Sequence, residues 1–580
     1  MTGLKKLISL ASAAALSVSM CTVSVSASEA YDPYNYDRWG DAISSQAGYT
    51  ADDFVDGNTI GCGTMNEPAD IFVSHDNLVY IVDKGNDRII VTDIEFNFKK
   101  EMKRFTYSPD LISGISIEAD AMSGTEFAAG RYMLECNGDN FKILDENGAA
   151  LLNEKGKAIN ESISAKKVTA SNGAAFKSGD KIIVNYDGTS VTAEQEVYTS
   201  LKKPTGIFVD RFTALVYIAD NENGRVIKCD TDGNVLKEFG RPDSELYDAE
   251  LTYNPNKVLV DKAGNVYIVV RSVTKGAVMY NSEGKFLGFY GANRVEQTAE
   301  VLANAFWNII STDEQRERTA KNTPIGFTNF DIDELGFIYT VTESTETTTD
   351  LVKKLNPRGD NILDSLGAAD MTFGDIPPAY YSIYAKNSSL TDIDLGPNGE
   401  LNILDFQHGR IFQYDKECWL LFIMGGTGEQ LGTFRSATAI ESHDDKLYVV
   451  DSRKNGVTIF TRTTFGEIVT EAANLYNDGK YEESLEPWKS VLKYDGNYRR
   501  AYIGIGNALF NRFEYEEAME YFEISISRNR YSRAFEGYRD EWLKENFTAI
   551  MIVIIVAVVA IMVLGHLKKK GKLKFLKGGA

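Results

Sequence analysis

Histidine and cysteine are scarce in this chain of 580 residues, and their spacing excludes the common metal and nucleophile sites. There are four histidines and five cysteines. No two histidines have the His-x-x-x-His or His-Glu-x-x-His spacing of a zinc enzyme, and the cysteines do not have the spacing of a zinc site. The sequence also lacks the Gly-x-Ser-x-Gly motif of a serine hydrolase and a phosphate-binding loop. We therefore predict no catalytic residue, no metal ligand and no required cofactor.

Basic residues are outnumbered by acidic ones, 61 to 83, which gives a net charge of −22. Eight of the lysines lie in the two terminal segments described next, so the rest of the chain carries 53 basic and 83 acidic side chains, a net charge of −30. This field repels the phosphates of nucleic acid, and no nucleic-acid partner is expected. A solvated acidic surface that keeps an exported protein soluble accounts for the charge.

The two ends of the chain predict an exported protein held in a membrane. Residues 1–27 combine Lys5 and Lys6 with an apolar stretch and small final residues, the pattern of a secretory signal peptide. Residues 547–566 contain an apolar run long enough to cross a bilayer as one helix. Residues 567–580 carry six lysines and no acid, which places this tail in the cytoplasm. We expect a single-pass protein of the cell membrane with its N-terminal ectodomain outside.

Between Asn66 and Phe465 one short pattern occurs six times. It has an apolar approach, a step of the form Tyr-apolar-x-Asp and, in several copies, an arginine followed by an apolar residue. The six steps are Tyr80–Asp83, Tyr217–Asp220, Tyr267–Val270, Tyr339–Thr342, Asn402–Asp405 and Tyr448–Asp451. Alternating β-branched and aromatic residues separated by turn residues predict about four short strands per copy. Repeats of about 40–50 residues with this content are typical of propeller blades.

The recurring acidic and basic positions of these copies are interpreted as structural. They are Asp83, Arg88, Asp220, Arg225, Asp405, Arg410 and Asp451. The segments Asn86–Ile89, Gly224–Val226 and Gly409–Ile411 resemble the Asn-x-Arg step of the NHL-repeat β-propellers. This resemblance implies a mainly β fold with a six-bladed propeller over residues 31–465. It implies little about function, because propellers include binding proteins, lactonases, lyases and scaffolds. The third and fourth copies depart from the pattern, since they lack both Asp and Arg.

Residues 104–200 interrupt the propeller with a different pattern. The segments Gly124–Tyr132 and Phe176–Val184 resemble the short strands of small all-β modules of exported bacterial proteins. We predict an inserted all-β module on a blade loop, and a seventh blade is the alternative. Insertions of this kind lie at surface loops and often carry recognition.

After the last blade, over residues 466–545, the apolar spacing becomes helical. Matched positions recur 34 residues apart: Ala472 with Gly506, Leu475 with Leu509, Tyr481 with Tyr515, Ser484 with Ala518 and Trp488 with Phe522. The period resembles that of tetratricopeptide repeats, which implies two helical repeats followed by a final helix. A basic cluster in this region is the candidate face for docking a partner: Arg499, Arg500 and Arg512.

The sequence favours a membrane-anchored extracellular binding or scaffold protein. Its propeller would bind a carbohydrate, a peptide or a protein. Its helical repeats would dock a membrane protein, as an accessory part of a carbohydrate uptake or sensing system; a plain stalk is the other interpretation of these helices. An enzyme is the alternative from another class. Propellers that resemble gluconolactonases hold a divalent cation such as Ca²⁺ in the central channel, and lactonase or lyase chemistry would follow.

Overall fold

A computed structural model describes residues 30–37, 39–122, 127–153, 156–159, 161–291, 326–342, 351–363, 373–375 and 388–570. The expected signal peptide and residues 571–580 of the basic tail lie outside these ranges. The chain divides into two compact units. One comprises residues 1–34 and 47–463, and the other comprises residues 35–46 and 464–580.

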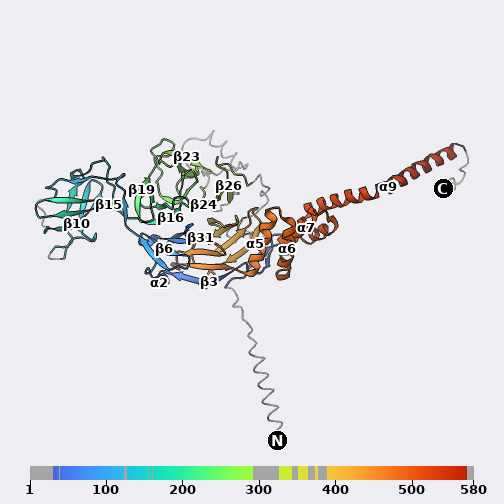
Figure 1. The fold of residues 1–580 in the computed structure, drawn as a ribbon, viewed down its shortest axis with the longest axis horizontal. Helices are drawn as coiled ribbons and strands as arrows, with labels where there is room; N and C mark the ends of the chain where they lie inside the picture. The colour runs from blue at the N-terminus through green and yellow to red at the C-terminus, as the bar shows by residue number, and fades with distance from the viewer. Residues whose placement is uncertain are drawn as a thin grey trace, which may run out of the picture. The chain divides into compact units, whose positions relative to one another are not determined.

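The first unit contains five four-stranded antiparallel blades in a propeller-like arrangement (Figure 1). Four blades follow the chain: β4 (Pro68–Val73), β5 (Leu78–Asp83), β6 (Arg88–Asp93) and β7 (Phe98–Met102); β16 (Pro204–Val209), β17 (Val216–Asp220), β18 (Arg225–Cys229) and β19 (Asn234–Phe239); β20 (Pro255–Val260), β21 (Val266–Val270), β22 (Ala277–Tyr280) and β23 (Phe286–Tyr290); β27 (Leu390–Leu395), β28 (Leu401–Asp405), β29 (Arg410–Tyr414) and β30 (Leu420–Gly425). In the fifth blade, β31 (Ala437–His443), β32 (Lys446–Asp451) and β33 (Gly456–Arg462) are joined by β3 (Tyr49–Asp56). An early strand therefore completes a late blade.

A three-stranded sheet corresponds to the fourth sequence copy. It contains β24 (Asn329–Ile332), β25 (Ile338–Val341) and β26 (Val352–Leu355). Residues 343–350, between β25 and β26, lie outside the described residues, and the count of six blades stays a prediction. β1 (Tyr34–Tyr36) pairs with β30 through Tyr34 and with β2 (Ala42–Ser44).

The first strand of each blade lies beside the first strands of its neighbours. β4 contacts β31 and β16, β16 contacts β20, and β27 contacts β31. β24 contacts both β20 and β27. These six innermost strands surround a central channel. The middle strands supply β-branched core residues such as Val82, Ile218 and Ile268, which are fully buried.

Most innermost strands share one irregularity near their start. Their pairing register shifts by one residue between Pro68 and Asp70, Pro204 and Gly206, Pro255 and Lys257, Leu390 and Asp392, and Ala437 and Ala439. A bulge of this kind bends the strand and redirects the following side chain. Proline is tolerated at the first residue of a strand because its missing N–H is not needed there.

The residues between β7 and β16 add a second group of strands. They are β8 (Phe105–Tyr107), β9 (Ile115–Ile117), β10 (Gly130–Asn137), β11 (Asn140–Asp145), β12 (Ser162–Ser164), β13 (Val168–Ala170), β14 (Lys181–Tyr186) and β15 (Val191–Thr199). β8 pairs with β15 on one side and with β19 on the other, which links this group to a blade. β9 and β13 form a separate pair. Short helical turns complete the unit: α2 (Gly57–Ile60), η1 (Lys84–Asn86) and η2 (Ala165–Lys167).

The second unit is helical. α5 (Thr464–Asn477), α6 (Tyr481–Tyr494), α7 (Arg499–Asn511), α8 (Tyr515–Ile524) and α9 (Arg528–Lys569) pack in chain order. Trp488 and Phe522, which match at a spacing of 34, are both buried. A Cβ added at Gly506 would lie 2.6 Å from the Phe522 ring, so this glycine allows α7 and α8 to approach.

α9 is one continuous helix of 42 residues (Figure 1). Its segment Phe547–Leu564 has no charged residue, and this part of the helix is not buried against the protein. It is long and apolar enough to cross a membrane, which is consistent with a single-pass anchor. The expected span of 547–566 therefore continues the last helix of the helical unit without a break.

Candidate functional site

The recurring aspartates lie at the end of the second strand of a blade and hold the loop that enters the same blade. Asp83 accepts the backbone N–H of Asn66 at 2.7 Å, and Asp220 accepts that of Lys202 at 2.7 Å. Asp405 accepts the backbone N–H of Ser389 at 2.8 Å, and Asp451 accepts that of Arg435 at 2.7 Å. All four aspartates are fully buried. Each of these hydrogen bonds lies within one blade, so the aspartates stabilise the loop that enters each blade.

In two blades the recurring arginine donates a hydrogen bond to the recurring aspartate. Arg88 Nε donates to Asp83 Oδ2 at 2.7 Å, and Arg225 Nε donates to Asp220 Oδ2 at 2.9 Å. Both pairs are buried, so each charge is compensated where water is excluded. The arginine therefore complements the aspartate inside the blade and is not directed to a ligand.

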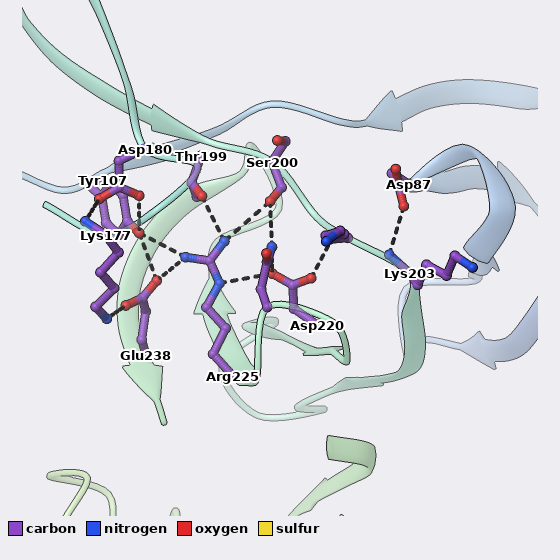
Figure 2. A network of polar contacts seen from close by, with 12 residues as sticks. Asp87, Tyr107, Lys177, Asp180, Thr199, Ser200, Lys203, Asp220, Arg225 and Glu238 are labelled. Atoms are coloured by element: carbon purple, nitrogen blue, oxygen red, sulfur yellow. Dashed lines mark hydrogen bonds and ion pairs between the residues drawn. The ribbon is translucent and has the colours of Figure 1, made fainter. Parts of the chain in front are cut away.

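Arg225 also connects its blade to the strands between β7 and β16, as Figure 2 shows. Its Nη1 donates to Tyr107 Oη at 2.9 Å and to Glu238 Oε1 at 2.6 Å. The Tyr107 hydroxyl lies 2.8 Å from Glu238 and 3.1 Å from Asp180. Burial raises the pKa of Asp180 to about 6. A buried network of ionisable groups thus fixes the junction between the two sets of strands.

The third pair is arranged differently. Arg410 forms its ion pair with Asp375. The His408 Nδ1 atom lies 2.7 Å from Asp405 Oδ2 and 3.8 Å from Asp375 Oδ2. Asp375, Asp405 and His408 form the single group of three ligand-type side chains that lie within 4.8 Å of one another in the described ranges. Arg410 already neutralises Asp375, so these groups are satisfied by protein partners.

Inside the channel, the residues that follow the five bulges, together with Asn329 at the start of β24, form a ring of mixed chemistry. The six positions, one on each innermost strand, are Asp70, Gly206, Lys257, Asn329, Asp392 and Ala439. The Lys257 Nζ atom lies 2.5 Å from Asp70 Oδ1 and 3.9 Å from Asp392 Oδ1. The side chain of Asn329 donates to Asp392. A single ammonium therefore lies between two buried carboxylates.

Gly206 allows Lys257 to reach Asp70, because β16 lies between β20 and β4. A Cβ at Gly206 would lie 2.6 Å from the carbonyl oxygen of Asn256 and 3.3 Å from Lys257 Cδ. The ring also joins successive blades. Asp70 accepts the N–H of Ile207 at 2.9 Å on the next innermost strand. We call the six residues Asp70, Gly206, Lys257, Asn329, Asp392 and Ala439 the channel ring.

The charges of the channel ring depend on one another. Burial raises the pKa of Asp392 to about 7, and the Lys257 ammonium opposes that rise. Burial alone would lower the pKa of Lys257, but Asp392 and Asp70 outweigh it, and the pKa of Lys257 is raised. Asp392 also accepts the N–H of Ile440 at 2.7 Å. The ammonium thus holds together carboxylates that would repel one another without it.

Two residues beyond the channel ring, each innermost strand places a second side chain toward the channel. These side chains are apolar on three strands and acidic on the other three. Alternate residues of a strand share a face, so the position follows directly from the ring. On β4, β16 and β20 it is occupied by Phe72, Phe208 and Leu259, and on β24, β27 and β31 by Asp331, Asp394 and Glu441. The rings of Phe72 and Phe208 are 5.2 Å apart. One half of this level is apolar and the other half carries three carboxyl groups.

The three carboxyl groups of this level accept hydrogen bonds from neighbouring strands. Asp331 accepts the N–H of Leu395 at 2.8 Å, and Glu441 accepts that of Val73 at 2.9 Å. The side-chain amide of Asn402 donates to Asp394 at 2.8 Å. Within the described part of the chain, no ion pair joins any of the three to a basic side chain. Their negative charge is therefore shared only with hydrogen-bond donors.

Burial shifts the titration of all three groups. Burial, and then the charge of Asp394, raise the pKa of Asp331 to about 7. The same two causes raise the pKa of Glu441 well above its ordinary value. Burial also raises the pKa of Asp394. Each group is costly to ionise in the absence of a positive charge.

A cavity of about 630 Å³ opens above this level. It is lined by the last residues of the innermost strands and by the turns that follow, including Phe72, Phe208, Asp331, Asp394 and Glu441. Its volume lies in the range of small-molecule sites. Two basic side chains of the lining form ion pairs: Arg211 with Glu334 at 3.0 Å, and Lys354 with Asp333 at 3.9 Å. The turns also present Phe212 and Leu335, which are largely exposed.

The three arginines expected to form a docking face are placed differently from one another. Arg500 is 5% exposed and lies over the ring of Tyr476, 4.8 Å from its centre. Arg499 Nε donates to the carbonyl of Ser525 at 3.0 Å. The side chain of Arg512 is 42% exposed and pairs with residue 514. Of the three, Arg512 offers the most accessible side chain.

Sequence reasoning did not find Lys257, Asp331, Asp394 and Glu441. Each lies in an apolar strand whose neighbours obey the repeat, and the repeat pattern draws attention to positions that recur. The available signal was the reverse of that pattern. A charged side chain at this place in an innermost strand is unexpected for a buried position, and it indicates a specific partner or ligand.

No protein-family model matches the sequence, and no curated protein matches it. Several solved structures are similar in fold. A catalytically inactive virginiamycin B lyase from Staphylococcus aureus with quinupristin is 10% identical, covers 71% of this chain and 99% of its own, and has a TM-score of 0.35. Hydrazine synthase of Kuenenia stuttgartiensis is 11% identical, with coverages of 69% and 96% and a TM-score of 0.33. PorZ, a surface component of the type-IX secretion system of Porphyromonas gingivalis, is 10% identical, with coverages of 71% and 67% and a TM-score of 0.26.

Proposed function

We propose that this chain is a membrane-anchored extracellular binding protein whose propeller takes a ligand, a carbohydrate or a peptide, in the channel cavity. The cavity carries the proposal. It is built from the ends of the innermost strands, which contribute phenylalanines on one side and carboxyl groups on the other. The recurring Asp and Arg residues serve the blades themselves. Chemistry that is found once, in a cavity of suitable volume, is what a ligand site requires.

The fold proposed around this site is a six-bladed propeller of the NHL type, in which β24–β26 is the sixth blade. The contacts of β24 with β20 and β27 support it, because they complete a ring of innermost strands. Residues 104–200 form an inserted all-β module between β7 and β16. The pairing of β8 with both β15 and β19 supports a firm attachment of this module.

The C-terminal part is proposed to hold the propeller outside the cell. The apolar part of α9 crosses the membrane, and residues 567–580 lie in the cytoplasm, since lysines favour that side. Helices α5–α8 form two tetratricopeptide-like repeats that dock a membrane protein of a carbohydrate uptake or sensing system. Arg499 and Arg512 are the candidate docking residues, whereas burial gives Arg500 a role in packing.

The enzyme alternative is a lactonase or lyase with a divalent cation in the channel. Asn and Asp side chains from different blades do meet there, at Asn329 and Asp392. The Lys257 ammonium, however, lies at the point where a cation would be held, 2.5 Å from Asp70 and 3.9 Å from Asp392. A positive side chain in that place opposes a divalent ion, so the binding role has the better support.

The proposal is tested by narrowing the cavity. Full-length protein in detergent is screened by thermal shift against panels of defined oligosaccharides and short peptides, and Leu335→Trp fills the cavity at a largely exposed lining residue. Leu287→Trp, on β23 and outside the lining, is the matched control. We expect a ligand that raises the midpoint of the wild type and of Leu287→Trp but shifts Leu335→Trp less. Binding that Leu335→Trp leaves intact, or no binding at all, contradicts the proposal. Turnover of a lactone that requires Ca²⁺ would favour the alternative.

A further inference from the structure

The floor of the cavity combines two chemistries that are rarely placed side by side. Phe72 and Phe208 form its apolar half, and Asp331, Asp394 and Glu441 form its acidic half. Both halves lie at the same level of neighbouring innermost strands, two residues beyond the channel ring. Phe72, Phe208, Asp331 and Glu441 are only partly buried, so a ligand in the cavity can reach them.

Within the described residues, no ion pair balances the charge of Asp331, Asp394 or Glu441. Counting the two innermost levels, five carboxyl groups face one ammonium, that of Lys257. Lys257 is committed to Asp70 and Asp392 on the level below. Buried carboxylates without a cation are costly, and they either take up protons or attract a positive group. Two of the basic residues that line the cavity, Arg211 and Lys354, pair with acids of the turn after β24.

From this arrangement we propose that the cavity takes an amphipathic cation, with an ammonium group among Asp331, Asp394 and Glu441 and the attached apolar group against Phe72 and Phe208. The proposal rests on the proposed function, because it names the ligand class of the same site. These carboxyl groups lie on one side of the cavity and offer acceptors to the N–H bonds of an ammonium, although their oxygens do not all lie within 4.8 Å of one another. The two phenylalanine rings supply apolar area, and their faces also attract positive charge.

The ammonium of such a ligand has three sources: the side chain of a lysine, the N-terminus of a peptide, and a small free amine. The chemistry that the cavity recognises is the same for all three. We use one probe for each source: acetyl-Phe-Lys-amide, Phe-amide and 2-phenylethylamine. The neutral partners are acetyl-Phe-norleucine-amide and acetyl-Phe-amide, and acetyl-Phe-Glu-amide is the anionic partner.

Binding is measured by calorimetry on the full-length protein in detergent at neutral pH. The strongest cationic probe is expected to bind at least ten-fold more tightly than its neutral partner, a difference of about 1.4 kcal/mol. Glu441→Gln keeps an acceptor for the N–H of Val73 but removes the charge, and it should abolish this preference. Asp444→Asn is the matched control, because that side chain is 80% exposed at the same cavity. It should leave the preference unchanged.

Phe208→Ala tests the apolar half. It should weaken the cationic and the neutral probes by similar factors, since both carry the phenyl group that packs there. The thermal midpoint of each variant shows that it is folded, and the relative affinity of the three cationic probes identifies the source of the ammonium.

Several outcomes overturn the proposal. The neutral or anionic probe binds as tightly as the cationic one, or Glu441→Gln retains the preference for the cation. If no probe binds but an oligosaccharide binds in a manner that Leu335→Trp disrupts, the amphipathic-cation proposal fails and the proposed function stands. If nothing binds in the cavity, both fail.

Discussion

Removing the ammonium of Lys257 should destabilise the propeller in a way that depends strongly on pH. In Lys257→Met the side-chain volume is nearly kept, but Asp70 and Asp392 lose the cation that lies between them. Breaking a buried ion pair from one side costs about 3–5 kcal/mol. For a unit the size of residues 47–463, unfolding entropies of ~2.1 cal/mol/K per residue convert each kcal/mol into about 1 °C. We therefore expect the propeller transition to fall by about 3–6 °C at pH 8.

The pH dependence follows from Asp392. Its folded pKa of about 7 lies above its ordinary value, so the native state binds more protons than the unfolded state between about pH 4 and 7. Stability therefore falls as pH rises through that window. Lys257 opposes the raised pKa, so its removal raises the folded pKa of Asp392 further and extends the window upward. The loss caused by Lys257→Met should be clearly smaller at pH 5, where Asp392 is protonated and needs no cation.

The control is a variant in which the three charged residues of the channel ring are replaced by neutral ones. The triple variant Asp70→Asn, Lys257→Met, Asp392→Asn keeps oxygen acceptors for the N–H groups of Ile207 and Ile440 while removing all three charges. It should recover most of the loss at pH 8, because a buried ion pair replaced as a whole is often neutral in stability. The assay is scanning fluorimetry or calorimetry of the full-length protein in detergent from pH 5 to 8. Equal losses at pH 5 and pH 8, or a triple variant as unstable as Lys257→Met, would refute the reasoning.

Two further predictions concern the same unit. Burial raises the pKa of Asp180 to about 6, so wild-type stability should fall by up to ~3 kcal/mol as pH rises from about 4 to 6; Asp180→Asn should remove that contribution, and a pH–stability curve unchanged in the variant would contradict it. Gly206→Ala places a Cβ 2.6 Å from the backbone carbonyl of Asn256, which cannot move cheaply, so we expect a loss of about 1–3 kcal/mol in chemical denaturation. Gly240→Ala, where no atom lies within 4 Å of the added Cβ, is the control and should be close to neutral.

The sequence predicted the propeller-like fold because its strands carry local signals. Tyr80–Asp83 and Tyr217–Asp220 alternate β-branched and aromatic residues and end in an aspartate, and both form the ends of second strands. The apolar helix was predictable for the same reason, since an apolar run long enough to cross a bilayer is a local signal. The pairing of β3 with β33 was not predictable in this way. It joins residues about four hundred positions apart, and no local pattern in Tyr49–Asp56 indicates its partner.

The arginine cluster shows a second limit of local reasoning. Arg499, Arg500 and Arg512 are close in sequence and share a charge, which suggested one basic face. The helical geometry separates them: residues adjacent in a helix point about 100° apart. Arg500 consequently points into the helical unit beside Tyr476, whereas Arg512 is partly exposed. Charge counted along the chain is therefore a weak guide to charge gathered on a surface.

The candidate site was not predicted from the sequence. Residues that every blade needs recur in each repeat, whereas residues that line one cavity do not. A position that every blade needs must recur, as Asp83, Asp220, Asp405 and Asp451 do. A position that contributes to one asymmetric cavity need not recur, and here it is occupied by three kinds of side chain: Phe72 and Phe208, Leu259, and the acids Asp331, Asp394 and Glu441. Those residues occupy equivalent places in the innermost strands, where the fold is satisfied by any side chain that fits the channel. In a propeller with a binding site at its centre, the residues that contact a ligand should therefore be sought first at equivalent positions of the innermost strands where the residue type does not recur.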